Sequence, residues 1–143
     1  MTARTTPFLA FRFEVKVGPK AMGGFSECSG LQVRIETHDI VEGGVNNYVH
    51  RLPTRQRQND IRLRRGLAGQ RLWEWYSAWT GGRPSWQTCS IVLWAENGTD
   101  VVAEWQVLRA WPVAWLGPEL DATRSAVAVE TVELAHAGIK RVR

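Results

Sequence analysis

The sequence predicts a mainly β protein, an antiparallel two-sheet sandwich or barrel with one flanking helix, built as a single domain over residues 1–143. Three observations lead to this prediction. Apolar and charged residues alternate in several short segments, as they do in strands with one buried face. Gly-Gly and Asn-Gly pairs separate such segments, as they do in hairpins. A helical period occurs in one stretch alone, residues 67–80.

The first strands follow from alternation. Residues 11–17 place apolar side chains at every odd position, and residues 31–38 repeat the pattern. The phase breaks at 39–40, which indicates a bulge or a hairpin that leaves the core. Gly43-Gly44 supplies the turn, and residues 45–53 return as the partner strand.

The middle of the chain changes its period. Residues 59–65 alternate, with Arg62 and Arg64 on the polar side of the expected strand. From 67 to 80 the period is helical, and Gly81-Gly82 ends it. One face of this helix carries Leu72 and the aromatic residues that we expect in the core, Trp75, Tyr76 and Trp79. Other tryptophans could serve the core or a subunit interface, namely Trp73, Trp86 and Trp115.

The last third of the sequence predicts three further extended segments. Strands are expected near 88–95 and 101–109, joined by an Asn97-Gly98 turn. Pro112 and the Gly117-Pro118 pair are expected to interrupt the next extended stretch. The final strand is expected over 124–135, with Glu130 and Glu133 on opposite sides and solvated.

Size and composition fit a globular chain. It is 44% hydrophobic and 22% charged, with no apolar run long enough to cross a bilayer. The N-terminal stretch lacks the apolar core of a signal peptide, so we expect cytoplasmic synthesis without conventional export. Cys28 and Cys89 lie far apart, and two buried thiols are the expectation.

Reaction chemistry is not predicted. The segment around Ser26 lacks the second glycine of a nucleophile elbow, because Cys28 takes that position. The histidines show no metal-ligand spacing, and there is no phosphate-binding glycine loop. We therefore expect neither an enzyme nor a cofactor or metal site.

The arginines between residues 51 and 71 allow two interpretations. Seven arginines lie there against one aspartate, Asp60. A basic β-barrel that binds nucleic acid is one possibility. The other is an assembly surface, on which carboxylates of a neighbouring subunit pair with the arginines; the candidates are Glu36, Glu42, Glu74 and Glu119. The residue pattern by itself leaves both open.

An ordered set of segments resembles the inner tube proteins of contractile tails, the family that includes contractile phage tail tubes and the tubes of extracellular contractile injection systems; type VI secretion tubes share its fold. The resemblance runs from about residue 8 to residue 138. It rests on segments 24–31, 42–44, 51–53, 61–67, 72–76, 110–113, Trp115, 117–118 and 129–136.

The resemblance implies a tail-tube fold and a structural role. Six copies form a ring, and rings stack into a hollow, rigid tube inside a sheath whose contraction drives the tube forward. The implied partners are further copies of the chain, the sheath, the baseplate and spike hub, a tube-terminating cap, and cargo in the channel, either protein effectors or DNA.

Two groups of site residues are expected under this resemblance. A projecting hairpin that contacts adjacent subunits and the next ring corresponds to Val41, Glu42, Gly43, Gly44, Val45 and Asn46. A polar face that lines either the channel or a seam between rings consists of Gln32, Arg34, Glu36 and His38, or of Arg62 and Arg64.

Overall fold

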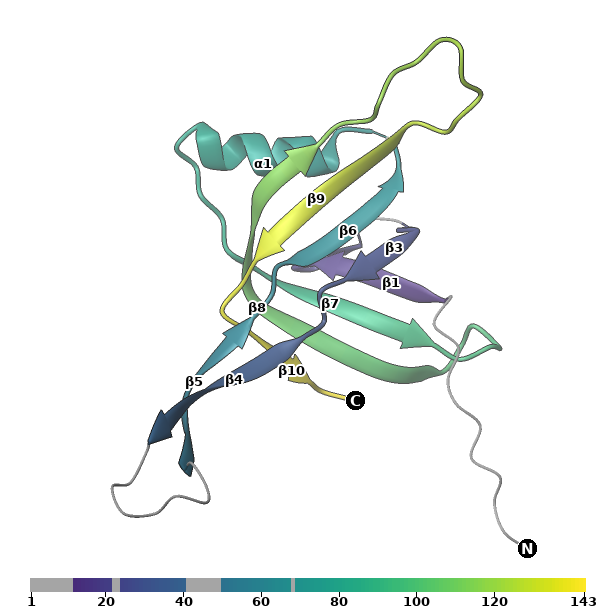
Figure 1. The fold of residues 1–143 in the computed structure, drawn as a ribbon. Helices are drawn as coiled ribbons and strands as arrows, with labels where there is room; N and C mark the ends of the chain where they lie inside the picture. Colours follow the sequence, from purple (N-terminus) through teal and green to yellow (C-terminus); the bar gives the residue numbers. More distant parts are fainter. Residues whose placement is uncertain (1–11, 22–23, 41–49, 68) are drawn as a thin grey trace, which may run out of the picture.

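The computed structural model describes residues 12–21, 24–40, 50–67 and 69–143 (Figure 1). The strands are β1 (Phe13–Val17), β2 (Lys20–Ala21), β3 (Glu27–Ser29), β4 (Val33–Ile40), β5 (His50–Gln58), β6 (Ile61–Gly66), β7 (Gln87–Trp94), β8 (Val101–Leu116), β9 (Val129–Ala135) and β10 (Gly138–Arg141), and the helix is α1 (Arg71–Thr80). None of the helical structure in these ranges has the length and apolar character that crossing a bilayer requires.

Within the described residues, eight strands form one antiparallel sheet that folds over on itself. Their order is β2-β1-β7-β8-β9-β6-β3, and β10 adds to β8. The sheet leaves its two ends unjoined, so the fold is an open sandwich and not a closed barrel. The strands β4 and β5 form a separate two-stranded sheet. This confirms the predicted fold class of antiparallel sheets with a flanking helix.

The long strand β8 belongs to both layers. Its first part pairs with β7 as far as Ala110, and its second part pairs with β9 from Trp111 onward. At the joint, Arg109 has a positive φ of 49°. The expectation that Pro112 interrupts the extended chain is wrong, because Pro112 lies within β8 beside an irregularity in its pairing with β9. Such an irregularity tolerates a residue without an N–H donor.

Several other boundaries differ from the sequence expectation: the helix begins at Arg71 and not at residue 67, and the partner strand β5 extends to Gln58 and not only to residue 53. The strand expected over 124–135 begins at Val129, so residues 117–128 connect β8 to β9 outside the strands. It is also not the final strand, because β10 follows it over Gly138–Arg141. In the ribbon, the register shift lies between Ile35 and Thr37, where β5 carries one extra residue. The ribbon also leaves the body of the protein, which was one of the two explanations for the broken phase at 39–40 (Figure 1).

The core lies between the two layers. The alternation of β6 buries Ile61 and Leu63, and β9 contributes Val132 and Leu134 from the neighbouring strand. From the other layer come residues such as Val107. Burying each such side chain contributes about 1.5–3 kcal/mol. Helix α1 anchors to this core through the fully buried Leu72, with Trp75 packed against the same cluster.

Both cysteines are free thiols, and burial determines their chemistry. Desolvation raises the pKa of Cys28 to about 11 and that of Cys89 to about 12. Since the thiolate is the nucleophile, we expect iodoacetamide to modify the native protein at pH 8 far more slowly than the protein unfolded in guanidinium. Mass spectrometry of timed samples measures both rates. Equal rates in the two states would contradict the burial of these thiols.

The same pKa shifts predict how stability depends on pH. The raised pKa values favour the neutral thiol in the folded state, so their contribution is complete below the ordinary thiol pKa. This contribution to stability is lost as the pH rises from the ordinary thiol pKa of about 8.5 through the pKa values of the two thiols in the folded protein.

Candidate assembly surface

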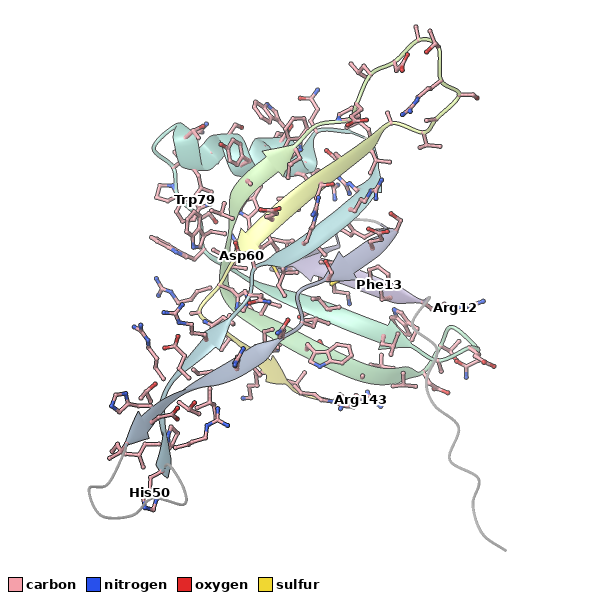
Figure 2. The ribbon with its side chains drawn as sticks, in the orientation of Figure 1. Arg12, Phe13, His50, Asp60, Trp79 and Arg143 are labelled. Atoms are coloured by element: carbon pink, nitrogen blue, oxygen red, sulfur yellow. The ribbon has the colours of Figure 1, made fainter. Side chains whose placement is uncertain are left out.

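The ribbon of β4 and β5 projects from the body of the subunit (Figure 1). Its strands pair with each other, and in the described residues neither has another strand on its outer edge. Figure 2 shows His50 toward the far end of the ribbon and Asp60 at its base. Apolar side chains on the ribbon face water: Ile35 is 58% exposed and Val33 is 48% exposed. An unpaired edge with exposed apolar side chains is typical of a surface that another chain covers.

The predicted polar face of β4 forms one wall of a groove. Gln32, Arg34, Glu36 and His38 are spaced two residues apart, so the strand turns them to one side. They line a shallow groove of about 690 Å³ together with residues of the partner strand and the turn after it, namely Thr54, Arg57 and Asn59. That this face lines a channel or a seam stays a prediction.

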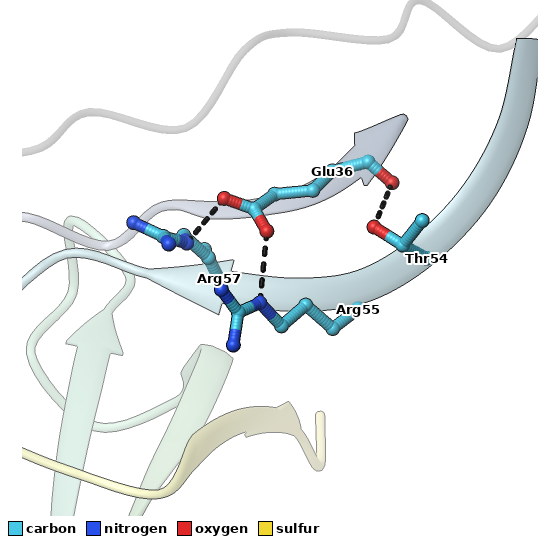
Figure 3. Close-up of polar contacts among 4 residues, drawn as sticks. All are labelled: Glu36, Thr54, Arg55 and Arg57. Atoms are coloured by element: carbon cyan, nitrogen blue, oxygen red, sulfur yellow. Dashed lines mark hydrogen bonds and ion pairs between the residues drawn. The ribbon is translucent and has the colours of Figure 1, made fainter. Parts of the chain in front are cut away.

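Glu36 is the electrostatic centre of this groove (Figure 3). Its carboxylate accepts a 2.9 Å hydrogen bond from Arg55 Nε and pairs with Arg57, and its main-chain oxygen accepts from Thr54 Oγ1. The hydrogen bond from Arg55, followed by the charge of Arg57, holds the pKa of Glu36 below its usual range. Glu36 thus stays ionised and ties the two strands together where β5 carries its extra residue.

The base of the ribbon is fixed by polar contacts to the body. Asn59 Nδ2 donates to Gln32 Oε1 at 2.9 Å, and the main-chain oxygen of Asn59 lies 2.8 Å from His136 Nε2. Gln58 Nε2 donates to the main-chain oxygen of His136. These contacts join the residues at the base of the ribbon, just before β4 and at and just after the end of β5, to the turn between β9 and β10.

Arg62 and Arg64 are exposed on the outer side of β6, as predicted. Arg64 lies 3.7 Å from the carboxylate of Glu27 on β3. Both arginines line a second groove, of about 1250 Å³, beneath the loop 117–128. The structure therefore brings Gln32 and the three β4 residues together and the two β6 residues together, but in separate grooves.

A buried ion pair was missed by the sequence analysis. Arg65 Nε donates to Glu130 Oε1 at 2.8 Å, and Trp115 Nε1 donates to the other carboxylate oxygen at 3.2 Å. Glu130 is 1% exposed, so the expectation that it is solvated is wrong. A signal was present: Arg65 continues the phase of Ile61 and Leu63 on β6. The strand alternation requires whatever stands there to face the core.

The aromatic side chains of α1 lie between the core and the surface. Trp75, Tyr76 and Trp79 are each partly buried. Trp79 packs edge-on against Trp86, with the ring centres 5.0 Å apart, and tilted against Trp111 at the same separation. The helix thus covers β8 with a layer of aromatic rings that pack edge-on or tilted against one another. The exposed members of the layer include Trp73, which contacts Trp115, and Trp86.

The predicted contact hairpin, residues 41–46, lies outside the described residues, and its role stays a prediction. The arginines are better defined. Five of the seven pair with carboxylates of their own chain: Arg51 with Asp39, Arg55 and Arg57 with Glu36, Arg64 with Glu27, and Arg65 with Glu130. Glu36, proposed as a partner from a neighbouring subunit, acts within the same chain. This internal pairing weakens the case for a phosphate-binding surface.

Comparison with known proteins places this geometry in a family. A family model described as T4-like virus tail tube protein gp19 matches residues 9–140. Among curated proteins, none matches the chain. Solved structures do match it. A chain of an extracellular contractile injection system, the PVC sheath–tube complex in the extended state, has 26% identity and a TM-score of 0.85, covering 94% of this chain and 90% of that chain.

Two further structures extend the comparison. A chain of the anti-feeding prophage cap, the AFP tube terminating cap, has 26% identity and a TM-score of 0.89, covering 99% of this chain and 94% of that one. Hcp1 from Flavobacterium johnsoniae shares the fold at 14% identity and a TM-score of 0.55, covering 91% of this chain and 94% of its own. The chain therefore belongs to the T4-like virus gp19 tail tube protein family, as a tail tube protein related to those of contractile injection systems.

Proposed function

We propose that this chain is the structural subunit of the inner tube of a contractile particle. Six copies form a ring, and rings stack into a hollow tube that sheath contraction propels and that conducts or carries cargo. The chain works by self-assembly, without a catalytic site or a cofactor. Its other partners are the surrounding sheath, the baseplate and spike hub, and a terminating cap.

The observation that carries this proposal is the projecting β4–β5 ribbon. Its two outer edges are unpaired in the described residues, and apolar side chains such as Ile35 are exposed on it. A lone two-stranded ribbon is only marginally stable in water. Pairing with neighbouring copies would satisfy the edges and cover the apolar side chains, and repetition of that contact builds a wall of strands.

The proposed partners agree with the complexes in which similar chains occur. Matching chains are found in a sheath–tube complex, a tube-terminating cap, a sheath/tube terminator and a six-fold symmetrised baseplate. The six-fold symmetry of that baseplate matches the symmetry of a ring of six subunits.

Negative-stain microscopy of the purified protein tests the proposal. Rings or hollow tubes support it. A particle that stays monomeric and binds DNA with an affinity that falls steeply with salt would support the nucleic-acid alternative instead.

The hairpin assignment is tested at its turn. We expect the double substitution Gly43→Val and Gly44→Val to abolish rings and tubes while the circular dichroism of the monomer is retained, because β-branched residues disfavour the positive φ values of tight hairpin turns. Gly24→Val is the matched control, since Gly24 has open space around its Cα. Normal tubes from the double variant would reject the assignment of residues 41–46.

A further inference from the structure

We propose that residues 117–128, the β8–β9 loop, dock on a second copy of the chain at Trp86 and Arg109, which contact each other, and at Arg83, three residues before Trp86 in the chain. These three residues are called the corner patch. The inference rests on the proposed function, since it identifies one contact through which tube subunits join. It commits to a second copy of the chain as the partner.

The β8–β9 loop presents apolar side chains to water. Leu120 is 84% exposed and Val127 is 79% exposed, the highest values among the large exposed apolar residues of the described chain. Exposed Leu116, the last residue of β8, lies directly before the loop. Several such side chains in one projecting segment indicate a contact surface, whereas a single one would need no explanation.

The tip of the loop is held in one conformation. Asp121 Oδ1 accepts hydrogen bonds from the main-chain N of Thr123 at 2.9 Å and from its hydroxyl at 2.6 Å. These bonds hold the pKa of Asp121 below its usual range, so the group is charged near neutral pH. Leu120 is therefore presented between two carboxylates, those of Glu119 and Asp121, on an ordered turn.

The corner patch has the opposite character. Trp86 is 50% exposed, and the guanidinium of Arg109 lies over its ring, 5.1 Å from the ring centre. Arg109 has a φ of 49°, a conformation that favours glycine. A charged residue kept in a strained backbone conformation at the surface points to a role for its side chain.

The charges of the two surfaces are complementary. Among the ion pairs of the described residues, neither Arg83 nor Arg109 has a carboxylate partner. The loop supplies Glu119 and Asp121, the latter 3.8 Å from Arg124 Nε of the same loop, and between them a leucine that can pack on the exposed part of Trp86. Arginine and tryptophan are the residue types that dominate the energetic centres of protein interfaces.

The positions of the two surfaces favour a repeating contact. Figure 1 shows the β8–β9 loop extending at the upper right, while the connection from α1 to β7, which carries Arg83 and Trp86, runs at the left. A contact between different surfaces of identical copies is heterologous, and it either closes a ring or continues as a filament. A tube subunit needs a contact of this type.

Charge reversal on either side tests the contact. We expect Glu119→Arg and Arg109→Glu each to raise the lowest protein concentration that yields rings or tubes by about tenfold or more, the effect of losing one central charged contact. Two controls make the same changes in charge elsewhere: Glu96→Arg in the β7–β8 turn and Lys140→Glu on β10, both exposed. Both controls should assemble as the wild type does.

Mixing the two variants gives the sharper result. In an equimolar mixture, the arginine at 119 meets the glutamate at 109, and the unchanged loop meets the unchanged corner patch, so alternating copies again pair opposite charges. The mixture should assemble at the wild-type concentration, measured by sedimentation and microscopy. Assembly of either single variant at that concentration, or a mixture that stays inert, would overturn the contact. The proposed function would survive that outcome, whereas failure of the wild type to form rings or tubes would reject both.

Discussion

Replacing Glu130 with glutamine is expected to destabilise the protein by about 3–5 kcal/mol, the cost of leaving a buried charge without its partner. Arg65 is 6% exposed, and its guanidinium would lose the buried carboxylate of Glu130 that lies 2.8 Å from its Nε. Such a loss is a large share of the 5–15 kcal/mol that holds a typical domain together. Urea denaturation followed by tryptophan fluorescence measures the change.

Two controls separate charge from packing in this experiment. Adding Arg65→Met to Glu130→Gln removes the unpaired charge and keeps an acceptor for Trp115, so most of the lost stability should return. Arg64→Met, one residue earlier and exposed, should cost at most about 1 kcal/mol. A loss from Arg64→Met as large as that from Glu130→Gln would show that burial of the ion pair is not what matters.

Gly30→Ala is expected to cost about 2–4 kcal/mol and to abolish tube assembly. Gly30 has a φ of +93°, and a Cβ built on it would overlap the main-chain oxygen of Asp60 and lie 3.2 Å from the Cα of Ile61. Both neighbours are backbone atoms and cannot turn aside as a flexible side chain could. The chain leading to β4 would have to lift from the turn before β6, and the whole ribbon would change direction.

Gly69→Ala isolates the steric part of this effect. Gly69 also has a positive φ, of +84°, but a Cβ there meets nothing within 4 Å. It should cost about 1 kcal/mol, the backbone penalty alone. Thermal unfolding of both variants, with microscopy of the same samples, gives the comparison. Equal losses would contradict the close approach at Asp60, and normal tubes from Gly30→Ala would contradict its importance for the ribbon.

The sequence predicts the regular elements well because each has a simple period. Strict alternation locates strands such as β1 and β6, and the apolar face of Leu72 and its neighbours locates α1. The pattern fails where tertiary pairing overrides local preference. The local sequence predicts that Pro112 interrupts the strand, yet β8 continues through Pro112 because it pairs with β9 there. No local signal indicates that Arg109 is the bend, since arginine has no preference for a positive φ.

The candidate surface is predictable only in part. Alternation groups Arg34, Glu36 and His38 of β4 with Gln32 just before it, and all four line one groove; it also separates Arg62 from the core. It cannot say which carboxylate reaches which arginine, because that depends on cross-strand register: the extra residue of β5 puts Arg55 beside Glu36. Residue type alone favours a solvated Glu130, but its cross-strand pairing with Arg65, which strand phase turns toward the core, buries it.

The shared strand β8 has a consequence for cooperativity. One continuous strand, β8, pairs with β7 in one layer and with β9 in the other. Unfolding of either layer would therefore remove strand pairing from the other layer as well. The body should therefore open as a single unit, whereas the ribbon, outside this ladder, has its own opening equilibrium. Under the proposed function, the ribbon could reach a neighbouring copy without loosening the body. The folding reaction and the assembly reaction are then energetically separate steps of one chain.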